Sequence, residues 1–155
     1  TCRDCHPVTY AKWHGTKHAH AYDSLFANPQ RDRRHDAECI TCHTTGFEYN
    51  SGWVSADKTP HLMGNQCENC HGPGSKHAQE PDNAEYRKLL TVATADVQKS
   101  NLCQRCHDED NSPKFKFETF MPQISHKGMD RYDRPEVHIG VKPKAGAVDS
   151  DSARK

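Results

Sequence analysis

Apolar side chains recur at helical spacing in only a few short stretches of this chain. The clearest stretch covers residues 7–27, where Pro7 suits a first helical position and Asn28–Pro29 ends the pattern. Gly15 interrupts the stretch, so we expect a broken or bent helix there. The polar residues that follow predict a loop before the next short element.

The other elements that the pattern predicts are short helices separated by turns. They cover residues 36–43, 66–71, 84–90 and 95–107, with Asn65, Asn83 and Thr94 as candidate N-caps of the last three. Gly72–Pro73–Gly74 ends the second of these helices and can reverse the chain. A small hairpin around Asn50–Ser51–Gly52 is the candidate for strand structure. We therefore predict a mostly irregular fold with short α-helices and little strand.

The sequence Cys-x-x-Cys-His occurs four times and uses every cysteine in the chain. This spacing is typical of c-type haem attachment, in which two thiols bind the porphyrin vinyl groups and the histidine ligates the iron. The predicted thioether cysteines are Cys2, Cys5, Cys39, Cys42, Cys67, Cys70, Cys103 and Cys106. The predicted proximal ligands are His6, His43, His71 and His107, so the expected cofactor is four covalently attached haem c groups.

Zinc binding and a disulfide framework are the two alternatives to haem for these cysteines. Zinc ribbons usually place about 15–20 residues between Cys-x-x-Cys pairs, whereas the gaps here are 33, 24 and 32 residues. Eight cysteines would also permit disulfides. Neither alternative requires histidine after the second cysteine, and all four copies have it, so haem attachment is favoured.

The apolar content is too low for an ordinary protein core. Leu, Ile, Val and Phe contribute only 20 of 155 residues, and a fraction below about 20% usually indicates disorder when net charge is high. Here 21 basic and 21 acidic residues cancel, so that second condition fails. Four apolar macrocycles would supply the missing core. We therefore expect residues 1–139 to wrap around a chain of closely packed haems, and residues 140–155 to form a polar tail packed on a neighbouring subunit.

The charge balance and hydropathy limit the partners and location of the protein. Haem propionates would make the balanced chain acidic, so no nucleic-acid partner is expected. No apolar run approaches the roughly 18 residues of a membrane span. Haem attachment to this motif takes place outside the cytoplasmic membrane in bacteria and archaea, so we expect an export signal upstream of Thr1. The expected location is extracellular or at the cell surface, with the periplasm as the alternative.

Eight further histidines exceed the four second axial ligands that four haems require. This surplus favours ligation by two histidines at each iron, although Met63, Met121 or Met129 would offer His/Met ligation. Position along the chain alone nominates His126, which follows the fourth motif, and His61, which precedes the third. The histidines held in reserve are His20, His14 and His138, and His35 is the least favoured.

Two segments resemble a lineage of multihaem c-type cytochromes. Residues 13–19, WHGTKHA, resemble its W-x-x-[ST]-x-H-A pattern, and residues 67–77, CENCHGPGSKH, resemble its C-E-x-C-H-G-P-G-S-x-H pattern. The lineage includes the tetrahaem electron acceptor of hydroxylamine oxidoreductase and tetrahaem cytochromes that form extracellular filaments. The resemblance implies that His18 and His77 are distal ligands to haems distant in sequence. It also implies alternating stacked and perpendicular haem pairs.

Four haems in 155 residues must lie close together, which favours electron transfer by hopping between haems. We expect the subunit of an extracellular conductive filament, joined head to tail with its own copies and exchanging electrons with redox proteins or extracellular acceptors. A monomeric periplasmic carrier is the alternative. A small nitrogen-oxide reductase with one five-coordinate haem is a further alternative, and a haem sensor is the least favoured. We expect electron transfer rather than enzymatic turnover.

Overall fold

The computed structural model describes residues 1–130 as short helices joined by turns, which confirms the predicted mostly irregular fold. The α-helices are α1 (Cys2–Cys5), α2 (Pro7–His14), α3 (Ala37–His43), α4 (Cys67–His71), α5 (Ser75–Gln79), α6 (Ala84–Leu90), α7 (Thr94–Lys99) and α8 (Phe117–Ile124). The 3₁₀ helices are η1 (Tyr22–Leu25), η2 (Pro29–Arg31), η3 (Pro60–Leu62) and η4 (Cys103–Arg105). The predicted tail over residues 140–155 lies outside the described residues.

The predicted helix over residues 7–27 is broken as expected. Pro7 occupies the first position of α2, and the helix ends at His14, one residue before Gly15. A series of turns then leads to η1. The break frees the segment that carries His18 from the axis of α2, so this histidine can face a different part of the molecule.

Side-chain caps explain where two of the predicted helices begin. The carboxylate of Asp36 accepts the backbone N–H of Glu38 at the start of α3, and the Asn83 side chain accepts that of Glu85 at the start of α6. The prediction of Asn65 as a helix cap was wrong, because Gln66 holds that position before α4. Asn65 uses its side chain elsewhere, as described below.

The helix predicted over residues 95–107 is much shorter in the structure. It begins at Thr94, which lies inside α7 rather than capping it, and ends at Lys99. Asn101 has a φ of 53°, a left-handed conformation that a helix cannot continue through. The fourth motif therefore begins on the separate short helix η4, and Cys106 and His107 directly follow that helix.

The predicted hairpin around Asn50–Ser51–Gly52 was wrong. Within residues 1–130 no strand forms, and one antiparallel bridge joins Thr44 to Met63. The chain folds into a compact turn instead, because Gly46 and Gly52 approach so closely that a Cβ on Gly52 would lie 1.5 Å from the Gly46 carbonyl oxygen. That contact closes a loop and leaves no room for a ladder of paired strands.

The apolar core of the described residues is small and lies beside the second motif. Tyr22, Leu25, Ile40 and Trp53 are buried against one another, and the rings of Tyr22 and Trp53 are 4.9 Å apart. Val97 is the other buried apolar side chain among residues 1–130. So little apolar burial by side chains agrees with a fold that depends on a further apolar group.

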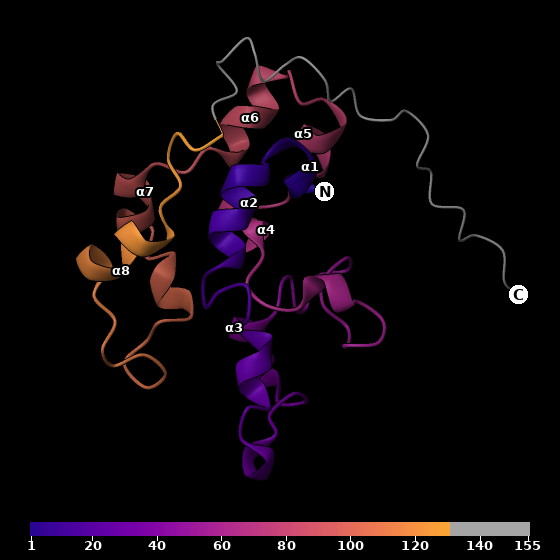
Figure 1. The fold of residues 1–155 in the computed structure, drawn as a ribbon, viewed down its shortest axis with the longest axis vertical. Coiled ribbons are helices and arrows are strands. Elements are labelled where there is room, and N and C mark those ends of the chain that lie inside the picture. Colours follow the sequence, from indigo (N-terminus) through magenta and orange to yellow (C-terminus); the bar gives the residue numbers. More distant parts are fainter. Residues whose placement is uncertain (131–155) are drawn as a thin grey trace, which may run out of the picture.

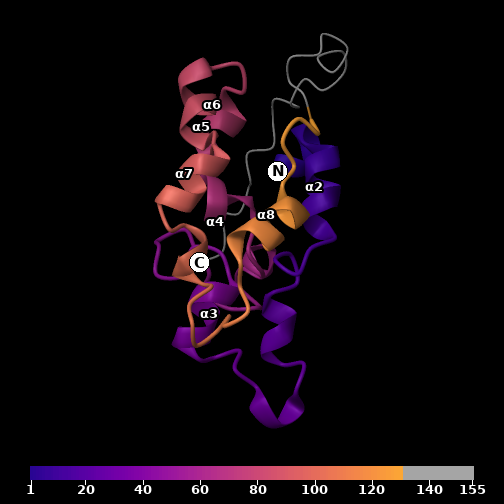
Figure 2. The same ribbon diagram turned by 90° about the vertical axis from the view of Figure 1, so that its left-hand side faces the viewer.

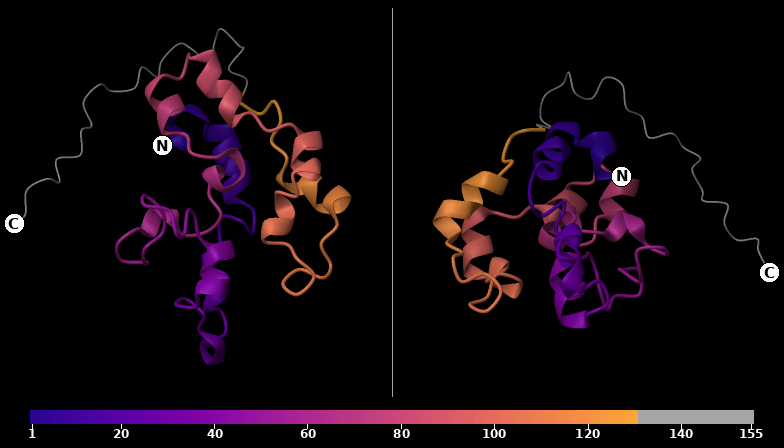
Figure 3. Two further views of the ribbon diagram at one scale, coloured as in Figure 1. Left: turned by 180° about the vertical axis from the view of Figure 1, so that it is seen from behind. Right: turned by 60° about the horizontal axis from the view of Figure 1, so that its bottom comes forward.

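The helices are arranged around the middle of an elongated molecule (Figures 1 and 2). Helices α1, α2, α5 and α6 gather at one end, and residues 22–36 form the opposite tip. Helices α7 and α8 lie side by side on one flank (Figure 3), where the Gln98 amide donates to the Glu118 carboxylate at 3.4 Å. None of the helices in residues 1–130 combines the length and apolar character needed to cross a bilayer.

Candidate haem-binding sites

Each of the four motifs has the local structure that haem attachment requires. Three cysteine pairs lie on α1, α3 and α4, and the fourth begins on η4 with Cys106 directly after it, so one helical turn places the two cysteines of each pair on the same side. The histidine follows within the same turn, as shown by hydrogen bonds of 2.8 Å from His6 N to Cys2 O and 2.9 Å from His107 N to Cys103 O. All eight thiols are free, and all lie within residues 1–130.

Three of the motif histidines lie opposite a second histidine from a distant part of the chain. The ring centres of His6 and His77 are 6.3 Å apart, with planes inclined by 30°. The pairs His18 with His107 and His71 with His126 have centres 5.8 and 5.6 Å apart, with planes inclined by 59° and 49°. The histidines opposite the motif histidines are His77, His18 and His126, which are three of the four distal ligands that the sequence nominates.

The spacing of these pairs fits one iron between two imidazoles. Bonds of about 2 Å from a metal to each imidazole nitrogen place the two ring centres roughly 6 Å apart. Burial lowers the pKa of His6, His18 and His107, which favours the neutral imidazole that ligates a metal. The donor set and its spacing therefore fit haem iron with two histidine ligands.

Hydrogen bonds at Nδ1 leave the other ring nitrogen available for a metal. Nδ1 of His71 lies 2.7 Å from the Leu90 carbonyl, and Nδ1 of His126 lies 3.1 Å from the Ile124 carbonyl. An imidazole that binds iron through Nε2 carries its proton on Nδ1 and donates it to such an acceptor. Both rings of this pair are thus held in the tautomer that ligation needs.

The turn after the third motif brings His77 to the first motif. Gly72 has a φ of 78° and ends α4, and the Glu68 carboxylate accepts the N–H of Gly74 at 2.6 Å. The reversed chain enters α5, where Nδ1 of His77 is buried without a hydrogen-bond partner among the described residues. An orphaned ring nitrogen is costly, and it marks a place where a further group belongs.

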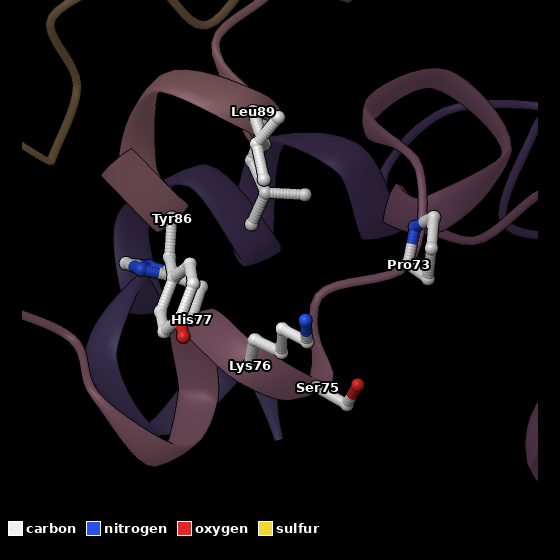
Figure 4. A pocket seen from close by; sticks show the side chains of 7 residues that line it. Pro73, Ser75, Lys76, His77, Tyr86 and Leu89 are labelled. Carbon is white, nitrogen blue, oxygen red and sulfur yellow. The ribbon is translucent and has the colours of Figure 1, made fainter. Parts of the chain in front are cut away.

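A cavity of about 270 Å³ lies beside His77, between α5 and α6 (Figure 4). Leu89 and Leu90 give it a mostly apolar wall. The Lys76 ammonium lies 5.8 Å from the ring centre of Tyr86 and provides the cationic side. An apolar wall with a cation at its edge suits the face and the propionate edge of a porphyrin.

Segment 64–65, just before the third motif, holds His18 in place. A Cβ on Gly64 would lie 2.4 Å from the Ala19 carbonyl oxygen, so only glycine allows this approach. The N–H of Asn65 donates to the His18 carbonyl at 2.8 Å. The Trp13 indole in turn donates to the Asn65 carbonyl at 2.7 Å. Sequence reasoning assigned Asn65 only a capping role and missed this contact.

The second motif differs from the other three. Nδ1 of His43 lies 2.6 Å from the Ala21 carbonyl, as expected for a ligating imidazole. Among residues 1–130, however, no second imidazole pairs with its ring. A cavity of about 500 Å³ adjoins His43 and Cys39 and is lined by Arg31 and Arg33. The second site thus has space and positive charge, without a paired histidine from the described chain.

Within residues 1–130, the other nominated histidines do not face a motif histidine. His61 is exposed and lies in no such pair, so its nomination stays unsupported by the geometry. His14 and His20 lie against each other with ring centres 5.2 Å apart, and His20 is further engaged by Asp23 at 3.4 Å. His35 is exposed, and His138 lies outside the described residues.

Thiols from different motifs touch. Cys2 and Cys67 share a hydrogen bond, which lowers the pKa of Cys2 to about 6 and raises that of Cys67. Cys106 lies beside Cys42, and burial together with that neighbour raises the pKa of Cys106 to about 12. The first attachment site therefore adjoins the third, and the second adjoins the fourth.

The third and fourth attachment sites are also neighbours. Burial raises the pKa of Cys70, and the thiol of Cys103 adds to that shift. The four sites consequently follow the spatial order first, third, fourth, second, although the chain visits them in a different order. Two features define the class of protein: histidines from distant segments lie in pairs, and thiols from different motifs are neighbours. Both are features of a multihaem c-type cytochrome, a class of electron carriers.

Comparison with known proteins agrees with that class. Residues 1–72 match the family described as cytochrome c554 and c-prime. Cytochrome c-554 of Nitrosomonas europaea is 30% identical over 159 residues, which span 85% of this chain and 68% of that protein. The chain belongs to the cytochrome c554 family, and its cofactor is haem c.

A second relative is larger than this chain. The multihaem cytochrome MtrA of Shewanella baltica is 28% identical over 95 residues, which cover 57% of this chain and 28% of that protein. No solved structure matches the chain. The predicted resemblance to a multihaem cytochrome lineage is thus confirmed.

Proposed function

We propose that this chain is a tetrahaem electron-transfer protein that relays electrons through its sites in the order first, third, fourth, second. The observation that carries the proposal is the pairing of three motif histidines with three distal histidines at ring separations of 5.6–6.3 Å. Haem c supplies a reversible one-electron iron couple at each site. The chain's own residues hold the sites in contact and fill the axial positions.

The paired rings support an assignment of three pairs of axial ligands. We assign His6 and His77 to the first site, His71 and His126 to the third, and His107 and His18 to the fourth. Each pair joins residues far apart in sequence, so the bonds to iron would also fix the tertiary fold. A pyridine haemochrome assay with intact mass should give four haems per chain. Electron paramagnetic resonance (EPR) of the oxidised protein should show at least three low-spin sites, and high-spin signals from two or more sites would contradict the assignment.

We further propose that copies of the chain assemble head to tail into an extracellular filament. The first and second sites are the two ends of the relay, and Cys2 at the first is exposed. The second site has no histidine partner within residues 1–130, while His14, His35 and His61 are exposed and available to a neighbouring copy. A head-to-tail contact that does not close into a ring gives a filament. The relay would then continue from one subunit to the next.

Electron microscopy of detergent-free protein tests the assembly. Thin uniform filaments are the expected result. Isolated small particles at every concentration would contradict assembly and leave a periplasmic carrier, the alternative for an exported cytochrome. Fractionation of the native host, with filament and cell-surface fractions compared with the periplasm, distinguishes the two locations.

A nitrogen-oxide reductase is a second candidate function, which the cavity beside His43 favours. Arg31 and Arg33 line that cavity, and guanidinium groups attract anions such as nitrite. Carbon monoxide should bind the reduced monomer only if the second site has an open axial position. Binding to wild-type protein, together with nitrite turnover, would support the reductase. Binding that appears only in His138→Ala would instead show that His138 completes the second site within the chain.

A further inference from the structure

The imidazole of His107 is held by a different kind of partner from those of the second and third motifs. Its Nδ1 lies 2.8 Å from the hydroxyl oxygen of Ser112. The Nδ1 atoms of His43 and His71 lie 2.6 and 2.7 Å from backbone carbonyl oxygens. A hydroxyl is a weaker acceptor than a peptide carbonyl, and a side chain can be replaced where a backbone group cannot. The fourth site therefore has an adjustable acceptor at its motif histidine.

The face of the same imidazole is covered by an aromatic ring. The ring of Phe115 stacks on His107 with centres 4.5 Å apart and planes inclined by only 14°. Phe120 continues the stack at 5.8 Å from Phe115, with planes inclined by 17°. Stacking of this closeness opposes rotation of the imidazole about its bond to Cβ. The hydrogen bond to Ser112 fixes the ring's edge, so its plane is constrained in two directions.

The loop that carries both residues is closed by its own hydrogen bonds. The N–H of Ser112 donates to the Asp108 carbonyl at 2.9 Å, and the N–H of Phe115 donates to the Ser112 carbonyl at 2.9 Å. The Asp108 carboxylate accepts the backbone N–H of Asn111 at 2.7 Å and its side-chain amide at 2.9 Å. Residues 108–115 thus present Ser112 and Phe115 to His107 from a self-supporting loop.

The pair that contains His107 also has the most crossed rings. The planes of His18 and His107 are inclined by 59°, compared with 49° and 30° in the other two pairs. Imidazoles donate π electrons to the iron orbital perpendicular to their own plane. Two imidazoles with parallel planes therefore separate the energies of the two iron π orbitals, whereas two imidazoles with crossed planes leave those energies nearly equal. The EPR spectrum of the oxidised iron reports this splitting directly, so the plane of His107 has a spectroscopic signature.

We propose that Ser112 and Phe115 are positioning residues that set the fourth site apart from the others. Phe115 fixes the plane of the His107 imidazole, and Ser112 sets how strongly that imidazole donates electrons to the iron. A stronger acceptor at Nδ1 gives the ring more imidazolate character, stabilises oxidised iron and lowers the reduction potential. The inference rests on the proposed assignment of His107 and His18 to one iron.

Substitution of Ser112 in mature haem-loaded protein either strengthens or removes the hydrogen-bond acceptor at Nδ1 of His107. Ser112→Asp should lower the reduction potential of one site, and Ser112→Ala should raise the potential of the same site. Ser24 provides a matched control, because its hydroxyl lies 3.1 Å from Nδ1 of His43 while the Ala21 carbonyl remains at 2.6 Å. Ser24→Ala should therefore shift the potential of the second site less. Unchanged potentials in both Ser112 variants would overturn the role of Ser112.

Substitution of Phe115 tests the plane of the ring. Phe115→Leu removes the stacked ring, and the low-field EPR signal of one site should shift while the other low-spin signals stay fixed. Phe115→Tyr keeps the stack and should give the wild-type spectrum, so it separates loss of stacking from loss of folding. Phe120→Leu is the matched control, since Phe120 stacks on Phe115. A wild-type spectrum in folded Phe115→Leu protein would overturn the role of Phe115.

The wild-type spectrum separates failure of this inference from failure of the proposed function. Three low-spin signals in the wild-type protein support the ligand pairs whatever the variants show. If the wild-type protein shows three such signals, but substitution of Ser112 leaves the reduction potentials unchanged and substitution of Phe115 leaves the signals unchanged, only the positioning roles are overturned. A high-spin fourth site in the wild-type protein would overturn the ligand pair and the inference together.

Discussion

The indole Nε1 of Trp13 donates to the carbonyl of Asn65 at 2.7 Å, across 52 residues of sequence. Asn65 also uses its other polar groups. Its N–H donates to the His18 carbonyl, and its side-chain amide donates to the Cys42 carbonyl at 2.8 Å. The amide of Asn69, between the cysteines of the third motif, donates to the Asn65 side-chain oxygen. One residue therefore connects the second motif, the third motif and His18, whose ring lies opposite that of His107 in the fourth motif.

Loss of the indole donor should destabilise the protein measurably. Trp13→Phe keeps an aromatic ring but leaves the Asn65 carbonyl without this partner, at a cost of about 1–2 kcal/mol in the free energy of unfolding. Denaturant unfolding followed by haem absorbance measures the change. Tyr49→Phe, at a residue that is 78% exposed, is the control and should leave the midpoint unchanged. Equal midpoints for Trp13→Phe and wild type would show that the indole bond does not contribute.

Two glycines with similar backbone conformations should respond differently to alanine. Gly64 and Gly72 have φ values of 75° and 78°, so alanine costs about 1–2 kcal/mol at either position through conformation alone. At Gly64 the new Cβ would also meet the Ala19 carbonyl at 2.4 Å, whereas nothing lies within 4 Å at Gly72. Thermal unfolding should therefore show the larger loss for Gly64→Ala. A similar loss in both variants would mean that the backbone at Ala19 yields easily.

Removal of a paired histidine should open one iron to an external ligand. His126 pairs with His71 at 5.6 Å, so reduced His126→Ala protein should bind one more carbon monoxide per chain than wild type. His61→Ala is the control in monomeric protein, because His61 is exposed and faces no motif histidine. Optical titration with carbon monoxide counts the open sites. Extra binding in His61→Ala with none in His126→Ala would reverse the assignment of these two residues.

The Asp130 carboxylate should stabilise the fold in a pH-dependent way. Burial acts to raise its pKa, but hydrogen bonds from the N–H groups of Thr9 and Val8 outweigh burial and hold the pKa below the ordinary 3.8. A lowered pKa in the folded state contributes stability above the ordinary value, and that stability is lost as the pH falls through the lower one.

Thermal unfolding of wild-type protein and Asp130→Asn across the acid range measures this contribution. The difference in melting temperature between the two proteins should shrink as the pH falls below 3.8. The charge interaction between Asp130 and His6 is part of this difference, because it acts to lower the pKa of Asp130 and to raise that of His6. A constant difference at all pH values would exclude a role for the charge of Asp130.

The sequence indicated the cofactor and the character of the fold because both depend on local patterns. Cys-x-x-Cys-His and the cap at Asn83 act within one helical turn, so nearby residues are sufficient to predict them. The predicted hairpin failed because Gly46 and Gly52 close a loop through a contact between backbones. Helix α8 was not foreseen because Pro122, which usually ends a helix, lies inside it.

The pairing of histidines is a property of the tertiary fold and could not be read from spacing. His77 and His126 were nominated, but the partners His6 and His71 became visible only in the structure. His61 was nominated because it precedes the third motif, yet the chain turns it outward. Ser112 gave no signal at all, since a serine five residues after a motif histidine has many other uses.

The three histidine pairs span overlapping lengths of the chain, from residue 6 to 77, from 18 to 107 and from 71 to 126. A cut in the backbone anywhere between residues 6 and 126 therefore separates the two members of at least one pair. Under the proposed ligation, the two fragments of a nicked chain would stay joined through iron–imidazole bonds. The metal centres then serve as cross-links that open by ligand exchange, and a fragment that lacks one member of a pair cannot complete that site by itself.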